Sequence, residues 1–208
     1  YRVGGGPLLP GTAFVERALA AGARVGCIEL EDLTVTEPLP LPEDGAVRLQ
    51  CTVGEPDATG ARAFRVYAAA ADGDPWTTHA TGTLGPAEGA PGADPTAWPP
   101  PGAEPVGLDG VYDRLAELGA EYGPRFQGLR AAWRHGDEAY AEVAVPTGGA
   151  AFGLHPALFD AALHAIGLRA GAEERMTLPF AWNGVELYAP GATALRVRIA
   201  PAGTGAVR

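Results

Sequence analysis

The stretch PALFDAALHAIG (residues 156–167) decides how the chain folds, because it predicts a helix that is apolar on most of its faces. A second stretch, PGTAFVERALAAG (residues 10–22), is built in the same way. Each begins at a proline, continues through an alanine-rich body and ends at a glycine, which are usual start and stop signals of a helix. Such a helix must be buried, and a sheet wrapped around it is one way to bury it. The sequence therefore predicts two similar units, each with a helix against a sheet.

Strand-like runs bounded by turn residues surround both helices. Those that follow the first helix are residues 27–35, 47–53, 63–69 and 76–84. Those that flank the second helix are residues 128–134 and 139–146 before it, and 185–189 and 194–200 after it. A shorter helix is expected near residues 110–118, with Asp109 as its N-cap and Gly119 as its stop. The pattern predicts an α+β chain with antiparallel sheets.

A segment rich in proline, glycine and alanine, residues 85–107, has no period and divides the chain. We expect an N-terminal half at 1–84, a linker at 85–107 and a C-terminal half at 108–208. The halves are not complete copies, since the first has no strand-like run before its helix and the second has two. We therefore expect that strands ahead of Tyr1 and beyond Arg208 belong to a longer polypeptide.

Composition excludes several classes of function. The net charge is −10, whereas binding of nucleic acid needs clustered cations. The 208 residues contain no serine, which excludes a serine nucleophile. No apolar run reaches the roughly 18 residues that cross a membrane, so we expect no membrane segment and a cytoplasmic location. Cys27 and Cys51 are expected to be buried small side chains, and without a C-x-x-C pair they predict no zinc site.

Asp160 and His164 are the strongest candidates for chemistry. They are four residues apart and so project from the same face of the helix, among apolar neighbours. A charged carboxylate is costly in such surroundings, and a neutral carboxylic acid oriented by a histidine suits general acid catalysis. The alternative is a structural pair whose two groups satisfy each other. Spacing alone leaves both interpretations open.

Two glycine-containing stretches are further candidates for a site. VGGGPLLPG (residues 3–11) supplies backbone amides at a helix start, where they can polarise a carbonyl group. The alternative is a flexible lead into the helix. EYGPRFQGL (residues 121–129) is a tight turn that presents Tyr122 to a site, or a structural turn whose aromatic residues are core. His155 is either a helix cap or a wall of the site.

Four motifs in these stretches match one family. YRVGGGPLLP (residues 1–10) follows the pattern H-x3-G-x4-P at Gly5 and Pro10, with Tyr1 where the pattern has histidine. The second motif, GAEYGPRF (119–126), resembles G-Y-x-Y-G-P-x-F, with Ala120 in place of the first tyrosine. The third, HPALFDAALH (155–164), carries D-x3-H/Q. The fourth, LPFAW (178–182), carries L-P-F-x-W. Through these motifs essentially the whole chain resembles the dehydratase domain of modular type I polyketide synthases. The resemblance implies a double-hotdog fold, in which two antiparallel sheets each wrap around a central apolar helix.

The resemblance also implies a reaction. Such dehydratases eliminate water from a 3-hydroxyacyl chain, carried on the phosphopantetheine of an acyl carrier protein, and give an enoyl thioester. By this resemblance Asp160 protonates the departing hydroxyl, His164 orients the acid, and Tyr122 is a hydrogen-bonding wall. The amide of Gly5 polarises the thioester carbonyl. The implied substrate-binding positions are Gly5, Pro10, Gly123, Phe126, Leu178 and Pro179.

The same resemblance implies the partners of the chain. They are the acyl carrier protein, the neighbouring domains of a multidomain synthase of antibiotic biosynthesis, and a second copy in a homodimer. No metal is expected, and no cofactor beyond the phosphopantetheine that carries the substrate.

Tyr1 departs from the family pattern. The family's histidine removes the α-proton, and a base at neutral pH needs a pKa near 7. A phenol with a pKa of about 10 is protonated more than about 99% of the time at pH 7. We therefore expect a dehydratase impaired at its general base, by nature or by replacement. Three alternatives stay open: an isomerase that shifts a double bond with Asp160 and His164, a non-catalytic structural or dimerisation domain, and a hotdog thioesterase.

Overall fold

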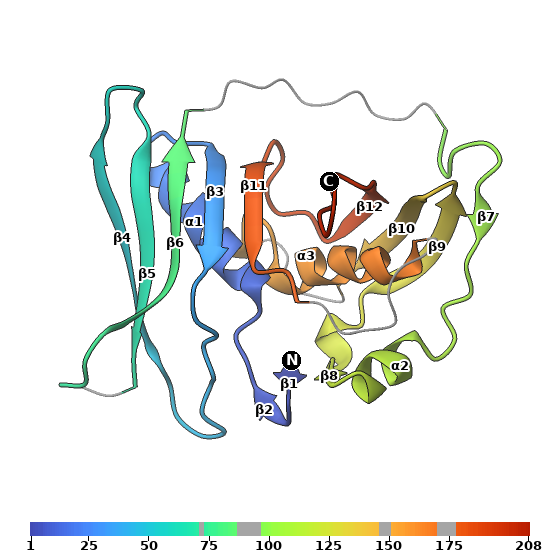
Figure 1. Ribbon diagram of the computed structural model, residues 1–208, viewed down its shortest axis with the longest axis horizontal. Helices are drawn as coiled ribbons and strands as arrows, with labels where there is room; N and C mark the ends of the chain where they lie inside the picture. Colours follow the sequence, from blue (N-terminus) through green and yellow to red (C-terminus); the bar gives the residue numbers. More distant parts are fainter. Residues whose placement is uncertain (71–72, 87–96, 146–150, 170–177) are drawn as a thin grey trace. The chain divides into compact units, whose positions relative to one another are not determined.

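A computed structural model of the chain describes residues 1–70, 73–86, 97–145, 151–169 and 178–208. Residues 87–96 of the expected linker lie outside the described residues. The chain divides into two compact units, which are unit 1 (residues 1–90 and 177–190) and unit 2 (residues 91–176 and 191–208). Figure 1 shows their helices and strands as a ribbon whose colours follow the sequence. Within the described ranges no helix has the length and apolar character to cross a membrane.

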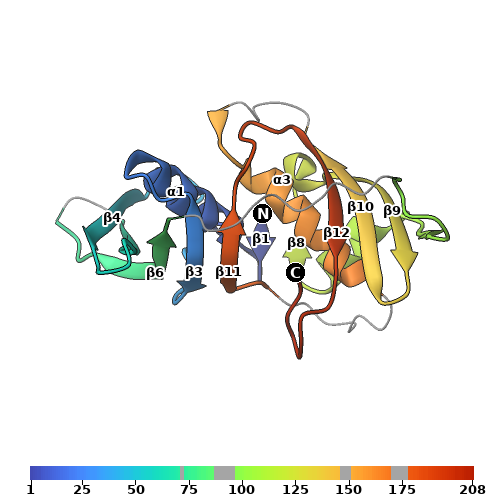
Figure 2. The ribbon, with the colours of Figure 1, turned by 90° about the horizontal axis from the view of Figure 1, so that it is seen from above.

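Unit 1 contains a five-stranded antiparallel sheet and one long helix, α1 (Gly11–Arg24). In sheet order, the strands are β11 (Ala181–Glu186), β3 (Glu29–Val35), β6 (Thr77–Gly85), β5 (Arg62–Ala69) and β4 (Arg48–Pro56). α1 contacts β3, β6 and β4 and lies along one face of the sheet (Figure 2). Phe14, Val15 and Ala18 of the helix are buried there. The first predicted helix and the four strand-like runs that follow it are confirmed.

Strand β11 joins unit 1 although it follows the second apolar helix in the chain. It pairs with β3, and Trp182 lies opposite Leu33. Trp182 is buried, and a Cβ atom at Gly11 would lie only 2.4 Å from its ring, so the ring packs against the first residue of α1. Residues 177–190 of the expected C-terminal half therefore group with unit 1, because this strand buries its tryptophan against the first helix.

Two short strands that the sequence analysis does not predict, β1 (Arg2–Val3) and β2 (Gly6–Pro7), precede α1. They form an antiparallel hairpin whose loop is Gly4 and Gly5, with φ angles of 60° and 87°. Positive φ at both loop residues is typical of the type I′ turn and favours glycine. The glycine stretch before α1 is therefore a defined turn and not a flexible lead.

Unit 2 contains a four-stranded antiparallel sheet and a second apolar helix. In sheet order, the strands are β12 (Ala194–Ile199), β10 (Glu138–Ala144), β9 (Leu129–His135) and β7 (Glu104–Pro105). The smaller elements are α2 (Val111–Glu117), β8 (Ala120–Glu121) and the 3₁₀ turn η1 (Pro124–Phe126). The apolar helix is α3 (Pro156–Leu163), which continues as the 3₁₀ helix η3 (His164–Leu168). The expected helix over 156–167 is confirmed, with a tighter last turn.

Helix α3 is the central element of unit 2. Its buried residues are Ala157, Leu158, Asp160, Ala161 and Ala162. The apolar ones share one core with Ala141, Val143 and Val197 of the sheet. At Gly128, just before β9, a Cβ atom would lie 2.6 Å from the Cβ of Ala161. The chain therefore passes α3 so closely that only glycine fits without a shift.

Two local predictions are wrong. Asp109 is not the N-cap of α2, because Gly110 occupies that position in a left-handed conformation and no side chain caps the helix. Cys51 is exposed, because β4 is an edge strand whose residues are largely open to solvent, whereas Cys27 is buried as expected. Gly119 does follow α2 with a positive φ, as a helix stop should.

The contact at Gly128 gives a first prediction. We expect Gly128→Ala to lower the free energy of unfolding by about 1–3 kcal/mol, because the added methyl group overpacks the contact with Ala161. Gly107→Ala is the matched control, since a Cβ atom there would meet nothing within 4 Å. Urea denaturation measures both variants. Equal stabilities would contradict the close approach of α3.

A bidentate ion pair joins β10 to β12. The guanidinium of Arg198 donates to both oxygens of Glu138, at 2.6 and 3.0 Å, and the hydroxyl of Tyr140 donates to the same carboxylate. The bond from Arg198, followed by that from Tyr140, lowers the pKa of Glu138 from 4.5 to about 2. A carboxyl group with a lowered pKa stabilises the fold above its ordinary pKa and loses this contribution as the pH falls.

A second prediction concerns acid stability. We expect wild-type stability to fall as the pH drops from about 4.5 to about 2, and Glu138→Gln to make that fall shallower. Glu117→Gln, at an exposed residue of α2, serves as the control and should keep the wild-type profile. Thermal melts across this pH range measure the effect. Identical profiles for wild type and Glu138→Gln would show that the ion pair contributes nothing.

Candidate functional site

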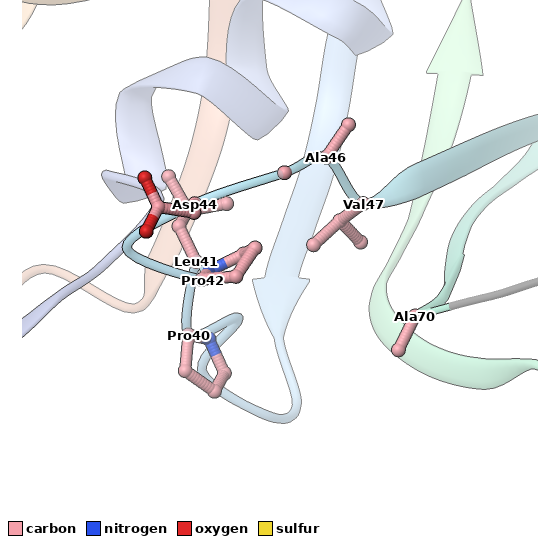
Figure 3. Close-up of a pocket in the computed structure, with 8 residues that line it drawn as sticks. Pro40, Leu41, Pro42, Asp44, Ala46, Val47 and Ala70 are labelled. Carbon is pink, nitrogen blue, oxygen red and sulfur yellow. The ribbon is translucent and has the colours of Figure 1, made fainter.

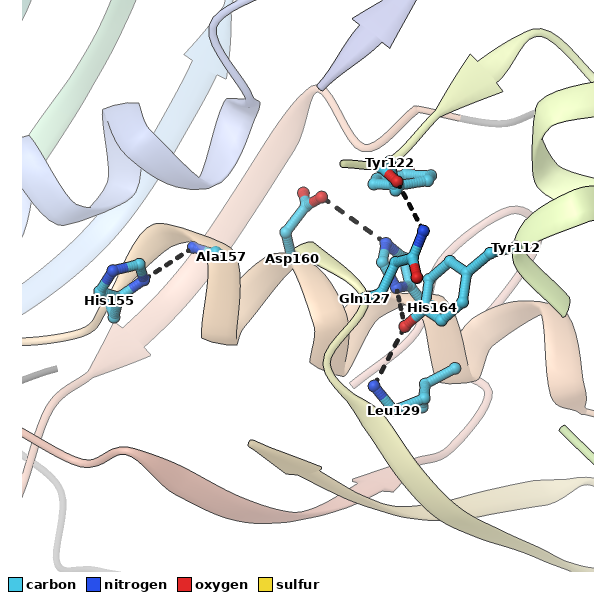
Figure 4. A network of polar contacts seen from close by, with 8 residues as sticks. All are labelled: Tyr112, Tyr122, Gln127, Leu129, His155, Ala157, Asp160 and His164. Carbon is cyan, nitrogen blue, oxygen red and sulfur yellow. Dashed lines mark hydrogen bonds and ion pairs between the residues drawn. The ribbon is translucent and has the colours of Figure 1, made fainter. Parts of the chain in front are cut away.

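The candidate site is built on α3 and its continuation η3. Asp160 lies in α3 and His164 opens η3, and the structure places the two side chains together as their spacing predicts. The carboxylate oxygen Oδ2 of Asp160 lies 3.6 Å from Nε2 of His164 (Figure 4). The side chain of His164 is 5% exposed and that of Asp160 is 13% exposed. An acid and an imidazole therefore face each other with little access for water.

The two facing atoms have no closer partner. Oδ2 of Asp160 and Nε2 of His164 are both buried, and neither makes a hydrogen bond within the described part of the chain. Leaving a buried polar atom unsatisfied typically costs about 1–3 kcal/mol. Such exceptions in a folded protein call for an explanation, and a reactive site is one.

Aromatic rings enclose His164. Tyr122, which follows β8, packs edge-on against the imidazole with ring centroids 4.3 Å apart. Tyr112, in the first turn of α2, packs edge-on at 5.6 Å. The two phenol rings also pack edge-on against each other, with centroids 6.3 Å apart, so the three rings form one cluster that restricts the imidazole.

Tyr112 also makes polar contacts in the site, and the sequence analysis assigns it no role. Its hydroxyl accepts a hydrogen bond from the amide of Leu129 at 3.0 Å and lies 3.5 Å from Nδ1 of His164. Burial is the main cause that raises the pKa of Tyr112, so the phenol stays protonated and can donate a hydrogen bond. No motif indicates this residue, because its partners are far away in the sequence.

The turn over residues 121–129 positions Tyr122. The side-chain amide of Gln127 donates to the carbonyl of Tyr122 at 2.8 Å and closes the turn around η1. Gly123 precedes η1 in an extended conformation, and Phe126 packs partly buried against the core of unit 2. Both interpretations of this stretch therefore hold in part. Phe126 packs against the core of unit 2, and Tyr122 packs against His164 in the site.

His155 is the N-cap of α3. Its Nδ1 accepts a hydrogen bond from the amide of Ala157 at 3.1 Å, and its ring packs edge-on against Phe152. Of the two interpretations of His155, the helix cap is confirmed.

The remaining predicted residues lie in unit 1. Tyr1 precedes β1, Gly5 lies in the hairpin loop, and Pro10 is the N-cap residue of α1. Leu178 and Pro179 precede β11. The structure thus assembles Asp160, His164 and Tyr122 within unit 2 and places these other candidates in unit 1.

Unit 1 also has a shallow pocket of about 530 Å³ on its surface (Figure 3). Its lining includes Pro40, Leu41, Pro42 and Val47, and it contains none of the residues predicted for the site. Among the described residues, no cluster of three or more histidine, cysteine, aspartate or glutamate side chains could hold a metal ion.

Comparison with known families gives two matches. The family model for the polyketide synthase dehydratase domain matches residues 1–69. The model described as the polyketide synthase dehydratase N-terminal domain matches residues 90–205. Together the two matches cover most of both units.

A curated relative and two solved structures agree with these matches. The chain is 52% identical over 217 aligned residues to the pikromycin polyketide synthase component PikAII of Streptomyces venezuelae. The alignment covers 100% of this chain but only 6% of that protein. A dehydratase structure from a study of substrate selection in the borrelidin and fluvirucin polyketide synthases has a TM-score of 0.94 at 46% identity, over 99% of this chain and 75% of the other. The erythromycin dehydratase has a TM-score of 0.92 at 45% identity, over 99% and 76%. The chain belongs to the polyketide synthase dehydratase family and has its double-hotdog fold.

Proposed function

We propose that the chain binds a 3-hydroxyacyl thioester on the phosphopantetheine of an acyl carrier protein and eliminates water from it, with Asp160 as the general acid. The observation that carries this proposal is the buried Asp160–His164 pair, whose facing atoms make no hydrogen bond to any other residue that the structure describes. The family to which the chain belongs supports the reaction class.

The elimination needs one acid and one base. A base removes the α-proton, the electron pair of that C–H bond forms the Cα=Cβ double bond, and the C–O bond at Cβ breaks. Hydroxide is a poor leaving group, so Asp160 gives its proton to the departing oxygen and water leaves. Asp160 is buried, so bulk water has little access to this proton transfer. No cofactor and no metal is needed for this sequence of steps.

The other candidates fit supporting roles. His164 orients the acid, and the hydroxyl of Tyr122 forms a hydrogen-bonding wall beside it. The backbone amide of Gly5 polarises the thioester carbonyl, which acidifies the α-proton. The substrate chain contacts the remaining positions, which are Pro10, Gly123, Phe126, Leu178 and Pro179.

Tyr1 occupies the position at which the family motif has its histidine, and we propose that it limits the reaction. A phenol is protonated at neutral pH, so it does not accept the α-proton efficiently. General base catalysis contributes about 100- to 10,000-fold to a rate, and this is the size of the deficit expected here.

The partners follow from the same proposal. The aligned relative is a large synthase of which this chain spans a small part, so neighbouring synthase domains and an acyl carrier protein are the proposed partners, with a homodimer as the proposed assembly. The proposed location is the cytoplasm, where such a synthase would meet its carrier protein.

A third prediction tests the general base. We expect Tyr1→His to raise the rate of water loss from a 3-hydroxyacyl-loaded carrier protein by about 100- to 10,000-fold, because imidazole titrates near neutral pH. Mass spectrometry of the carrier protein measures the loss of one water mass. Tyr1→Phe is the matched control and should stay as slow as wild type.

Each other outcome has a distinct meaning. Equal water loss by wild type and Tyr1→His would show that Tyr1 or another group already serves as the base. A shifted double bond without net water loss would favour an isomerase, and release of free thiol would favour a thioesterase. A folded Tyr1→His variant without any reaction would favour a structural domain.

A fourth prediction tests the acid. In the Tyr1→His background we expect Asp160→Asn to lower the dehydration rate by about 100- to 10,000-fold, since an amide cannot donate the proton. Asp109→Asn, at an exposed carboxylate of the same unit, is the control and should leave the rate unchanged. If Asp160→Asn keeps the full rate, Asp160 is not the general acid.

A further inference from the structure

We propose that Tyr112 is a positioning residue that fixes the tautomer of His164, with the proton on Nε2 and turned toward Asp160. The catalytic meaning of this inference rests on the proposed dehydratase function, whereas the tautomer itself does not. The residue lies outside the four family motifs, and its role comes from contacts that only the folded unit creates (Figure 4).

The donor fixes the direction of the hydrogen bond at the phenol oxygen of Tyr112. The amide of Leu129 donates to the hydroxyl oxygen of Tyr112 at 3.0 Å. Leu129 is the first residue of β9 and pairs with Val143 of β10, so its amide is fixed by the sheet. An amide has no acceptor capacity on its nitrogen, so the hydroxyl acts as acceptor in this bond and keeps its own hydrogen for another partner.

The hydroxyl hydrogen of Tyr112 needs an acceptor of its own. An acceptor within reach of that hydrogen is Nδ1 of His164, which lies 3.5 Å from the hydroxyl oxygen of Tyr112. Donation from the phenol requires a lone pair on Nδ1, which a neutral imidazole has there only when its proton is on Nε2. The reverse direction would leave the phenol hydrogen without an acceptor.

The other nitrogen of the His164 ring, Nε2, faces Asp160. Nε2 of His164 is buried and faces Oδ2 of Asp160 at 3.6 Å. A proton on Nε2 makes this contact attractive. The opposite arrangement, in which a protonated Oδ2 donates to Nε2, would place the ring proton on Nδ1, to which the hydroxyl of Tyr112 could not donate. Oδ2 is then the acceptor, and the proton that the acid transfers is confined to Oδ1. Because Oδ2 is buried, the 13% exposure of the Asp160 side chain lies on its other atoms.

The result is one chain of donors and acceptors, from the amide of Leu129 through Tyr112 and His164 to Asp160. Tyr112 acts on the acid only through the imidazole and does not contact the reacting atoms in this scheme.

The decisive measurement is the tautomer of His164 in the wild-type chain. Proton–nitrogen correlation spectra of isotope-labelled histidine rings at neutral pH distinguish a protonated Nε2 from a protonated Nδ1. The chain has four histidines, and the signals that disappear in His164→Gln assign the ring. We expect the pattern of a protonated Nε2. A protonated Nδ1 in the neutral ring would overturn the proposal, whatever the activity.

Tyr112→Phe tests the source of the effect. It keeps the aromatic ring and removes the hydroxyl, so the unprotonated Nδ1 should lose its hydrogen bond and its signal should move downfield. Tyr140→Phe is the matched control, since it removes a hydroxyl of unit 2 that bonds to Glu138. An unchanged Nδ1 signal in a folded Tyr112→Phe variant would overturn the proposal.

Kinetics in the Tyr1→His background give the second readout. We expect Tyr112→Phe to lower kcat about 3- to 10-fold with little change in KM, which is the scale of one lost hydrogen bond. Tyr140→Phe should leave both constants unchanged. A normal kcat for Tyr112→Phe would overturn the positioning role. If the Tyr1→His background shows no dehydration at all, the proposed function fails, and the spectra still decide the tautomer.

Discussion

A carboxyl group buried on an apolar helix is the constraint on which unit 2 depends. Asp160 lies among small apolar residues of α3, and these let the sheet and the strand start at Gly128 approach the helix closely. Close packing excludes water from the Asp160–His164 pair. The packing of α3 and the exclusion of water from this pair therefore have the same cause, and a looser helix would weaken both.

Local pattern predicts the elements of this fold well, because each long helix and strand carries its own period. It does not predict where an element goes. Trp182 marks β11 as apolar, but its partner is Leu33 of β3, far away in the sequence. The alternation around Cys51 separates two faces of a strand, yet an edge strand leaves both largely exposed. The strands of the β1–β2 hairpin have two residues each, which is too short for any period.

In the site, too, local sequence predicts some contacts and does not predict others. The spacing of Asp160 and His164 is local, and the pair forms as the helix requires. Tyr112 reaches His164 from 52 residues away in the sequence, and Leu129 reaches Tyr112 from the start of a strand. These contacts depend on how α2, β9 and α3 pack in unit 2, and that information is not present in any short motif. The contact between Asp160 and His164 was therefore predictable, and the contact of Tyr112 with His164 was not.

Two phenols of this chain show how one property has opposite consequences at two positions. A phenol holds its proton at neutral pH, and for this reason we propose that Tyr1 is a poor acceptor at the position of the general base. The same retention makes Tyr112 a dependable donor, and burial strengthens it by raising the pKa further. A histidine at position 112 could lie in either tautomer and so would not fix the imidazole of His164. The chemistry that argues against Tyr1 as a base therefore argues for the proposed role of Tyr112, which is to hold the imidazole of His164 in place.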